Sequence, residues 1–146
     1  AGMPSTRSIV ELKNGDLLWG LIGWFKGDDA KCPHVPGVYD NSNMLQRMRR
    51  VFVVKSTNRG RSWSYLSTVG YDPDVGLEGF NETAMVLLKN GDLLAVMRTG
   101  SGQPLYQSRS TDEGKTWSKP VPVGVCGVFP DMPLASICSS PVAIPL

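Results

Sequence analysis

Apolar residues along this chain form short runs between clusters of Gly, Asn, Asp and Ser, and no stretch sustains the period of a helix. Two stretches are closely similar, "ELKNGDLLWGLIG" at 11–23 and "LLKNGDLLAVMRTG" at 87–100. Each places Asn-Gly between two apolar runs, which is the strongest short signal for a β-hairpin because both turn residues can adopt positive φ. The pattern therefore predicts two hairpins of the same kind.

A second repeat follows each hairpin. "STNRGRSW" occupies 56–63 and "STDEGKTW" occupies 110–117, and we call them the first and second box. The third residue of each box can close a turn by accepting main-chain N–H bonds. The glycine supplies left-handed backbone, and the tryptophan, at the start of the next strand, can bury its indole against the neighbouring sheet. These are the needs of a tight hairpin rather than of a reaction, so we assign a structural role to the shared positions: Ser56, Asn58, Gly60, Trp63, Ser110, Asp112, Gly114 and Trp117.

The order of hairpin and box predicts four strands in each of two units, which is typical of β-propeller blades. The strands are expected near 6–12, 17–25, 49–56 and 62–69 in the first unit, and near 83–88, 93–99, 105–110 and 116–123 in the second.

We therefore predict an all-β fold in which residues 1–146 form a partial β-propeller domain. The first blade covers 5–70 and contains an inserted loop at 25–46, and long loops in compact folds are usually functional or disordered. The second blade covers 80–124, and 125–146 begins a third blade that is truncated or altered. Because two blades cannot close a ring, we expect a marginally stable chain that aggregates, self-associates through its open edges or is completed by a partner.

Charge and composition exclude several classes of partner. The chain has 15 Lys and Arg against 13 Asp and Glu, a net charge of +2, which gives no electrostatic case for nucleic acid or a membrane surface. The basic run "QRMRR" at 46–50 is interpreted as a solvated strand entry. No apolar run reaches the ~18 residues of a membrane helix. No signal peptide opens the chain, but the chain also begins without Met, so this says little about localisation.

Cysteine and histidine give no sign of a metal, cofactor or thiol mechanism. The three cysteines have no C-x-x-C spacing and the single histidine, His34, stands in a Pro-rich stretch, so neither a zinc site nor a disulfide framework is indicated. A Ser-His-Asp or Cys-His mechanism would have to use His34, and nothing nearby supports one. The cysteines are Cys32, Cys126 and Cys138.

The second box matches S-x-D-x-G-x-x-W, and the chain resembles the family that carries this Asp-box: the sialidases (neuraminidases) and their bacterial neuraminidase repeat relatives. The first box is a variant with Asn58 in place of Asp, and the resemblance covers about residues 5–130. It implies a six-bladed β-propeller, of which this chain holds about two blades and a remnant, and it favours a secreted or periplasmic protein. Other propellers with unrelated activities carry the box as well.

A glutamate and an arginine flank the second hairpin. Glu82 stands just before its first strand and Arg98 at the end of its second, so an antiparallel turn should return both to one rim. Similar sialidases carry this pair, and the resemblance implies that Glu82 partners a tyrosine nucleophile while Arg98 is one of three arginines that hold the sugar carboxylate. A guanidinium fork suits a carboxylate, and sialidases with a Tyr nucleophile depart from the usual pair of carboxylates. Glu78 is close enough in sequence to be the functional glutamate instead.

The resemblance leaves other site residues open. The family's acid/base is an aspartate on a loop of an early blade, and Asp29 or its neighbour Asp28 is the candidate, although neither stands in a family motif. The family's first arginine is followed by Ile-Pro, and Arg7 stands in "RSI" instead. The nucleophile and the remaining arginines would lie in later blades, since none of the tyrosines stands where the nucleophile belongs: Tyr39, Tyr65, Tyr71 and Tyr106.

Two functions from different classes follow. The first is an exo-sialidase-like glycoside hydrolase, or a fragment of one that is inactive alone, which cleaves terminal sialic acid or a related acidic sugar from glycoconjugates. The second is a non-catalytic Asp-box module that binds carbohydrate or protein. A polysaccharide lyase or another propeller enzyme is a third reading, because a fold does not fix a function.

Overall fold

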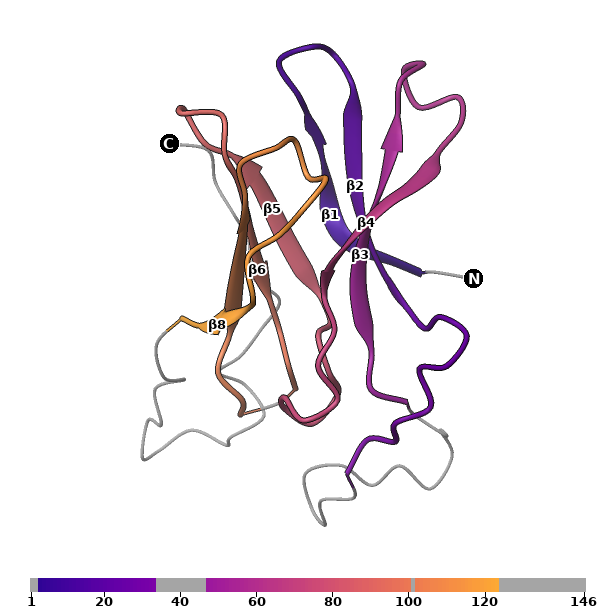
Figure 1. Cartoon of the computed structure of the whole chain (residues 1–146), viewed down its shortest axis with the longest axis vertical. Coiled ribbons are helices and arrows are strands. Elements are labelled where there is room, and N and C mark those ends of the chain that lie inside the picture. Colours follow the sequence, from indigo (N-terminus) through magenta and orange to yellow (C-terminus); the bar gives the residue numbers. More distant parts are fainter. Residues whose placement is uncertain (1–2, 34–46, 101, 124–146) are drawn as a thin grey trace.

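The structure is a computed structural model that describes residues 3–33, 47–100 and 102–123. Within these ranges it contains eight β-strands and no helix, arranged as two four-stranded antiparallel sheets that lie side by side (Figure 1). The prediction of an all-β fold built from two four-stranded units is therefore confirmed.

Each sheet keeps its strands in chain order, so every strand pairs with the next one along the chain. The first sheet consists of β1 (Met3–Glu11), β2 (Leu17–Gly23), β3 (Arg50–Ser56) and β4 (Ser64–Gly70). The second consists of β5 (Thr83–Leu87), β6 (Leu93–Met97), β7 (Tyr106–Ser110) and β8 (Val121–Pro122). β8 is much shorter than the predicted strand at 116–123, and prolines at 120 and 122 account for this because proline has no N–H for the ladder.

The two Asn-Gly turns are hairpins, but the expectation of positive φ at both turn residues is wrong. Only the glycines are left-handed, Gly15 with φ 85° and Gly91 with φ 96°. In the first turn the Asn14 side chain accepts a hydrogen bond from the Asp16 N–H at 3.0 Å, and the second turn repeats this bond from Asn90. The asparagine therefore closes the turn through its side chain rather than through its backbone conformation.

The two boxes are tight turns with matching hydrogen bonds, as the sequence predicted. In the second box Ser110 Oγ accepts from the Gly114 N–H at 2.9 Å, and Asp112 Oδ1 accepts from the Thr116 N–H at 2.9 Å. Gly114 is left-handed with φ 82°, and so is the residue before it, Glu113, with φ 61°. The first box makes the equivalent bonds among Ser56, Asn58, Gly60 and Ser62.

The hydrophobic core lies between the facing sides of the two sheets. Its fully buried members come from both sheets and include Leu18, Val51, Val53, Leu93, Ala95 and Met97. Trp117 of the second box packs against this core, and its indole Nε1 donates to Ser67 Oγ of β4 at 3.1 Å. Trp63 of the first box instead packs against Trp19 of its own sheet, with 5.6 Å between ring centroids.

The two ends of the sheets differ in character (Figure 1). The Asn-Gly turns and the boxes lie at one end, which we call the turn rim. The long connections lie at the other, and we define the loop rim as residues 24–33, 47–49, 71–82 and 98–100. Several predicted features fall outside the described residues: the rest of the inserted loop at 34–46, the third-blade start at 125–146, His34, Tyr39, Cys126 and Cys138.

Candidate functional site

A buried glutamate joins two arginines at the loop rim. The Glu78 side chain is 1% exposed, and its Oε2 accepts from Arg49 Nη1 at 3.0 Å and from Arg98 Nη1 at 3.3 Å. Arg98 Nη2 lies 3.2 Å from the other oxygen, Oε1. Arg49 directly precedes β3 in the first sheet and Arg98 directly follows β6 in the second. One carboxylate therefore binds a guanidinium from each sheet.

The backbone of the connection between β4 and β5 places this glutamate. The Arg49 N–H donates to the Glu78 carbonyl at 2.8 Å, the Phe80 N–H donates to the Arg49 carbonyl at 3.0 Å, and the Leu77 N–H donates to the Thr99 carbonyl at 2.8 Å. Gly79 lies between these bonds with φ +68°, and a Cβ there would come within 2.5 Å of the Arg49 backbone. Glycine is therefore required for this connection to pass between the two sheets.

Glu82 and Arg98 meet on the loop rim. The Arg98 N–H donates to the Glu82 carbonyl at 3.0 Å, which pairs the two ends of the hairpin. Arg98 Nη1 lies 3.9 Å from Glu82 Oε1. The side chain of Glu82 is 41% exposed and that of Arg98 is 13% exposed. The hairpin thus places a partly exposed carboxylate beside a mostly buried guanidinium, and their chemical roles stay predictions.

Glu78 and Glu82 have different surroundings, and these decide whether each can contact a substrate. Burial raises the pKa of Glu78, and Arg98 is the main influence that opposes this rise. Burial also lowers the pKa of Arg49. Because Glu78 is enclosed by its arginines and by Asn81, whose Nδ2 donates to Oε2, it has no surface to offer a ligand. Glu82 has such a surface, so it is the better candidate of the two for contact with a substrate.

Three polar atoms of this cluster are buried without a hydrogen-bond partner among the described residues. They are Arg49 Nε, Glu78 Oε1 and Asn81 Oδ1. Glu78 Oε1 is close to Arg98 Nη2 but not in hydrogen-bonding geometry. Unpaired buried polar atoms are few in folded proteins and call for a specific explanation. Their concentration here distinguishes this part of the loop rim from the rest of the described chain.

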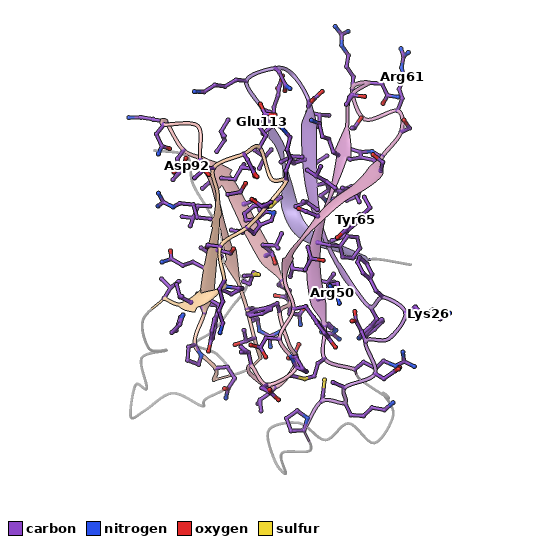
Figure 2. All side chains as sticks on the ribbon, in the orientation of Figure 1. Lys26, Arg50, Arg61, Tyr65, Asp92 and Glu113 are labelled. Atoms are coloured by element: carbon purple, nitrogen blue, oxygen red, sulfur yellow. The ribbon has the colours of Figure 1, made fainter. Side chains whose placement is uncertain are left out.

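Asp28 forms a second buried ion pair, with Arg50. Its Oδ1 lies 2.5 Å from Arg50 Nη2, and its Oδ2 accepts from Arg50 Nε at 2.7 Å and from the Phe25 N–H at 2.8 Å. Arg50, labelled in Figure 2, also stacks on the rings of Phe25 and Tyr71. The hydrogen bonds from Arg50 lower the pKa of Asp28. Asp28 is therefore held as the ion-pair partner of Arg50, and its role as the acid stays a prediction.

Asp29 lies beside this pair but faces solvent. Its side chain is 74% exposed and forms an ion pair with Arg47 at 3.1 Å. The loop that carries it is held to the residues before β3 by a hydrogen bond of 2.8 Å from the Met48 N–H to the Ala30 carbonyl. Exposed ion pairs of this kind contribute little to stability. Asp29 is accessible on the loop rim, and its role as proton donor stays a prediction.

The interpretation of 46–50 as a solvated strand entry is wrong for Arg49 and Arg50, whereas Arg47 is 43% exposed and residue 46 lies outside the described residues. Arg49 and Arg50 are each only 16% exposed, and both bind buried carboxylates. Their partners, Glu78 and Asp28, lie 29 and 22 residues away in the chain. No local pattern reveals such contacts. The sequence offers one signal for these contacts. Several arginines stand just before a strand, and that strand begins at the rim that carries the long loops.

Other candidates take part in packing. Tyr106 packs against Phe80, Tyr65 packs against Phe25, and Tyr71 lies over Arg50. Asp92 forms an ion pair with Arg109 at 3.2 Å on the turn rim (Figure 2). The described residues contain no group of three or more His, Cys, Asp and Glu that could hold a metal ion. The same residues include no helix that is long and apolar enough to cross a membrane.

No protein-family model matches the chain, and no curated protein matches it. A protein of unknown function from Dyadobacter fermentans DSM 18053 is similar in structure, with a TM-score of 0.58, 25% identity, and coverage of 78% of this chain and 26% of that one. The K499G mutant of NanB sialidase from Streptococcus pneumoniae gives a TM-score of 0.51 at 18% identity, and covers 80% of this chain and 13% of that one. The polysaccharide lyase PL25, an ulvan lyase, gives 0.51 at 15% identity, with coverage of 89% and 26%.

The chain thus spans about a quarter or less of the length of each of these structures. At such identities the likeness to the sialidase and the lyase extends to the fold alone. The two stacked four-stranded sheets are consistent with part of a sialidase-type β-propeller.

Proposed function

We propose that this chain is part of a glycan-processing protein of sialidase type, and that its loop rim binds an acidic sugar, terminal sialic acid or a close relative. The observation that carries the proposal is the pairing of Arg98 with the partly exposed Glu82, 3.9 Å apart at the loop rim. Two proteins with a similar fold are named a sialidase and a polysaccharide lyase. Both names support a carbohydrate ligand.

The chemistry follows from the two side chains. Arg98 is 13% exposed and a guanidinium fork suits a carboxylate, so Arg98 is the residue that would hold the sugar carboxylate. Glu82 would accept the proton of a tyrosine nucleophile from another part of the propeller, as in the sialidases with a Tyr nucleophile. A neutral phenol avoids repulsion by the bound carboxylate. Attack by the tyrosine would break the glycosidic bond, and the leaving oxygen would take a proton from the acid, for which Asp29 is the candidate. Water would then break the bond between tyrosine and sugar, which restores the tyrosine and releases the sugar with retention at the anomeric carbon.

Calorimetric titration of the chain with free sialic acid and with its methyl ester tests the binding step. The acid is expected to bind and the uncharged ester to bind much more weakly. Arg98→Lys should weaken binding of the acid by about 2–5 kcal/mol, because lysine cannot supply the bidentate contact. Glu82→Gln should leave acid binding within about threefold while lowering turnover of a fluorogenic sialoside by the complete propeller by ~10²- to 10⁴-fold. Equal binding of acid and ester, or unchanged binding in a folded Arg98→Lys variant, would contradict the proposal.

Binding without hydrolysis is the second candidate function for the chain alone. It is favoured by the packing of Tyr65, Tyr71 and Tyr106 against other side chains, which leaves none of these three as an evident nucleophile. Turnover of the fluorogenic sialoside separates the two functions. Both predict affinity for the acid, but a binding module shows no turnover in any longer form of the protein.

A further inference from the structure

Each Asn-Gly turn presents an asparagine to solvent and places a glycine directly after it. Asn14 and Asn90 are both exposed, and a Cβ added at Gly15 would meet no atom within 4 Å. Asparagine is among the residues that limit the chemical durability of proteins. A following glycine leaves its own backbone nitrogen unshielded, because it has no side chain. The two turns therefore combine the residue pair and the exposure that a spontaneous reaction of asparagine requires.

The reaction is deamidation, and all of its atoms come from the turn and from water. The glycine backbone nitrogen loses its proton and attacks the asparagine Cγ. A C–N bond forms, and the side-chain amide nitrogen takes up a proton and leaves as ammonia. Water then opens the resulting five-membered imide at either carbonyl carbon, which returns a hydrogen to the nitrogen. The product is an aspartate, or an isoaspartate whose backbone runs through the side-chain carboxyl.

The folded turn keeps the two reacting groups apart. The Asn14 side chain is directed past the glycine, where its Oδ1 accepts from the Asp16 N–H at 3.0 Å and its Nδ2 donates to Asp16 Oδ2 at 2.9 Å. The Gly15 N–H donates to the Leu12 carbonyl at 2.9 Å. The second turn repeats all three hydrogen bonds, at 3.1, 2.8 and 2.9 Å. Attack on Cγ requires that these bonds break, so it needs an opened turn.

An ion pair ties each turn to the third strand of its sheet. Lys55 of β3 lies 2.7 Å from Asp16 Oδ2, and Arg109 of β7 lies 3.2 Å from Asp92 Oδ2. The aspartate that binds each asparagine side chain is therefore itself held by a cation from the neighbouring strand. The restraint on the asparagine thus depends on the hairpin being paired within its sheet.

Deamidation would prevent the original turn from re-forming. It replaces the Nδ2–H donor at position 14 by a carboxylate oxygen, which would face Asp16 Oδ2 in place of the present 2.9 Å hydrogen bond. Two negative charges at such a separation repel each other. Position 58 is the matched case, because Asn58 takes in the first box the place of Asp112 in the second and accepts the equivalent N–H bond. A carboxylate therefore fits at position 58 but not at position 14.

We propose that Asn14 and Asn90 are sites of spontaneous deamidation, a covalent modification that the folded turns suppress and that proceeds when a hairpin opens. Each modification then marks the opening of one particular hairpin and leaves that hairpin unable to close as before. The inference is independent of the proposed function, because the turn rim lies at the opposite end of the sheets from the loop rim (Figure 1).

Incubation of the full chain in buffer and in concentrated urea, followed by peptide mapping, measures the suppression. Far-ultraviolet circular dichroism verifies the folded state, and digestion in isotope-labelled water separates residues that reacted during incubation from those that react during digestion. We expect Asn14 and Asn90 to react in urea and about tenfold or more slowly in buffer. Asn58 and Asn81, which are not followed by glycine, should react much more slowly than either in urea. Equal rates in buffer and in urea would overturn the suppression, and unmodified Asn14 and Asn90 in urea would overturn the assignment of the sites.

Reciprocal substitutions test the local restraint, with each rate compared with that of the same variant in urea. Asp16→Ala should accelerate the reaction of Asn14 and leave Asn90 unchanged, and Asp92→Ala should do the reverse. Acceleration of both sites by either variant would overturn the local restraint. Asn14→Asp should lower the urea midpoint, whereas Asn58→Asp should keep it. Equal midpoints for these two variants would overturn the claim that the modified hairpin cannot close as before.

Discussion

Ser67 of β4 makes a polar connection between the two sheets that can be removed with one substitution. Its hydroxyl donates to the Gly114 carbonyl of the second box at 2.5 Å and accepts from Trp117 Nε1 at 3.1 Å. Both partners belong to the second sheet's box, whereas Ser67 belongs to the first sheet. Ser67→Ala should therefore weaken the contact between the sheets without altering either turn.

The expected cost follows from what remains after the hydroxyl is lost. Trp117 Nε1 also donates to the Gly114 carbonyl at 3.2 Å, so neither group is left without a partner. A hydrogen bond contributes about 0.5–1.5 kcal/mol net, and the larger penalty applies only to groups that stay buried and unpaired. We expect Ser67→Ala to lower the free energy of unfolding by about 1–2 kcal/mol.

A double-mutant cycle separates this contact from general loss of packing. Ser67→Ala and Trp117→Phe should be coupled by about 0.5 kcal/mol or more, because both remove the same hydrogen bond. The chain supplies a matched control in Trp63, whose Nε1 donates to Gly60 of its own box at 3.1 Å. Ser67→Ala and Trp63→Phe should be additive within about 0.5 kcal/mol.

Urea unfolding of all variants, followed by far-ultraviolet circular dichroism, gives these energies without depending on tryptophan fluorescence. Equal slopes with denaturant are needed for the comparison. Coupling of the same size for both tryptophans would refute the assignment of the hydrogen bond, and so would a Ser67→Ala variant with wild-type stability.

Two further predictions concern carboxylates. Asp28→Asn should lower the free energy of unfolding in urea by about 3–5 kcal/mol, because it leaves Arg50 buried without its negatively charged partner. Asp29→Asn, at the exposed neighbouring position, should change this free energy by no more than about 0.5 kcal/mol. Similar losses for the two variants would contradict the structure. Hydrogen bonds from Thr116 lower the pKa of Asp112 to about 2, so its modest contribution to stability is present above about pH 4 and is lost as pH falls toward 2. In Asp112→Asn the unfolding midpoint should therefore depend less on pH over this range than it does in the wild type. An unchanged dependence on pH would count against the hydrogen bonds from Thr116.

The fold could be predicted because its determinants are local. The bond between Asn14 and Asp16 spans two residues, and the bond between Ser110 and Gly114 spans four. Each hairpin and each box is therefore specified by its own short stretch of sequence. Two details of the fold were predicted wrongly, each for a physical reason. The asparagines close their turns through side chains, and prolines shorten β8.

The candidate site could be predicted only where the hairpin determines it. Glu82 and Arg98 flank one antiparallel turn, so their proximity follows from the sequence. Arg49 was missed because its partner, Glu78, lies 29 residues away and reaches it through a connection that passes between the sheets. Such contacts depend on how two sheets pack, which periodicity and turn signals do not encode.

Binding of free sialic acid, mapped on the chain by ¹H–¹⁵N NMR, tests the central claim most directly. We predict saturable shifts at Glu82, at Arg98 and along 77–81 on the loop rim, with no comparable shifts in the boxes or when the methyl ester is added. Shifts centred on the turn rim, the same response to acid and ester, or no response at all would contradict an acidic-sugar site at the loop rim.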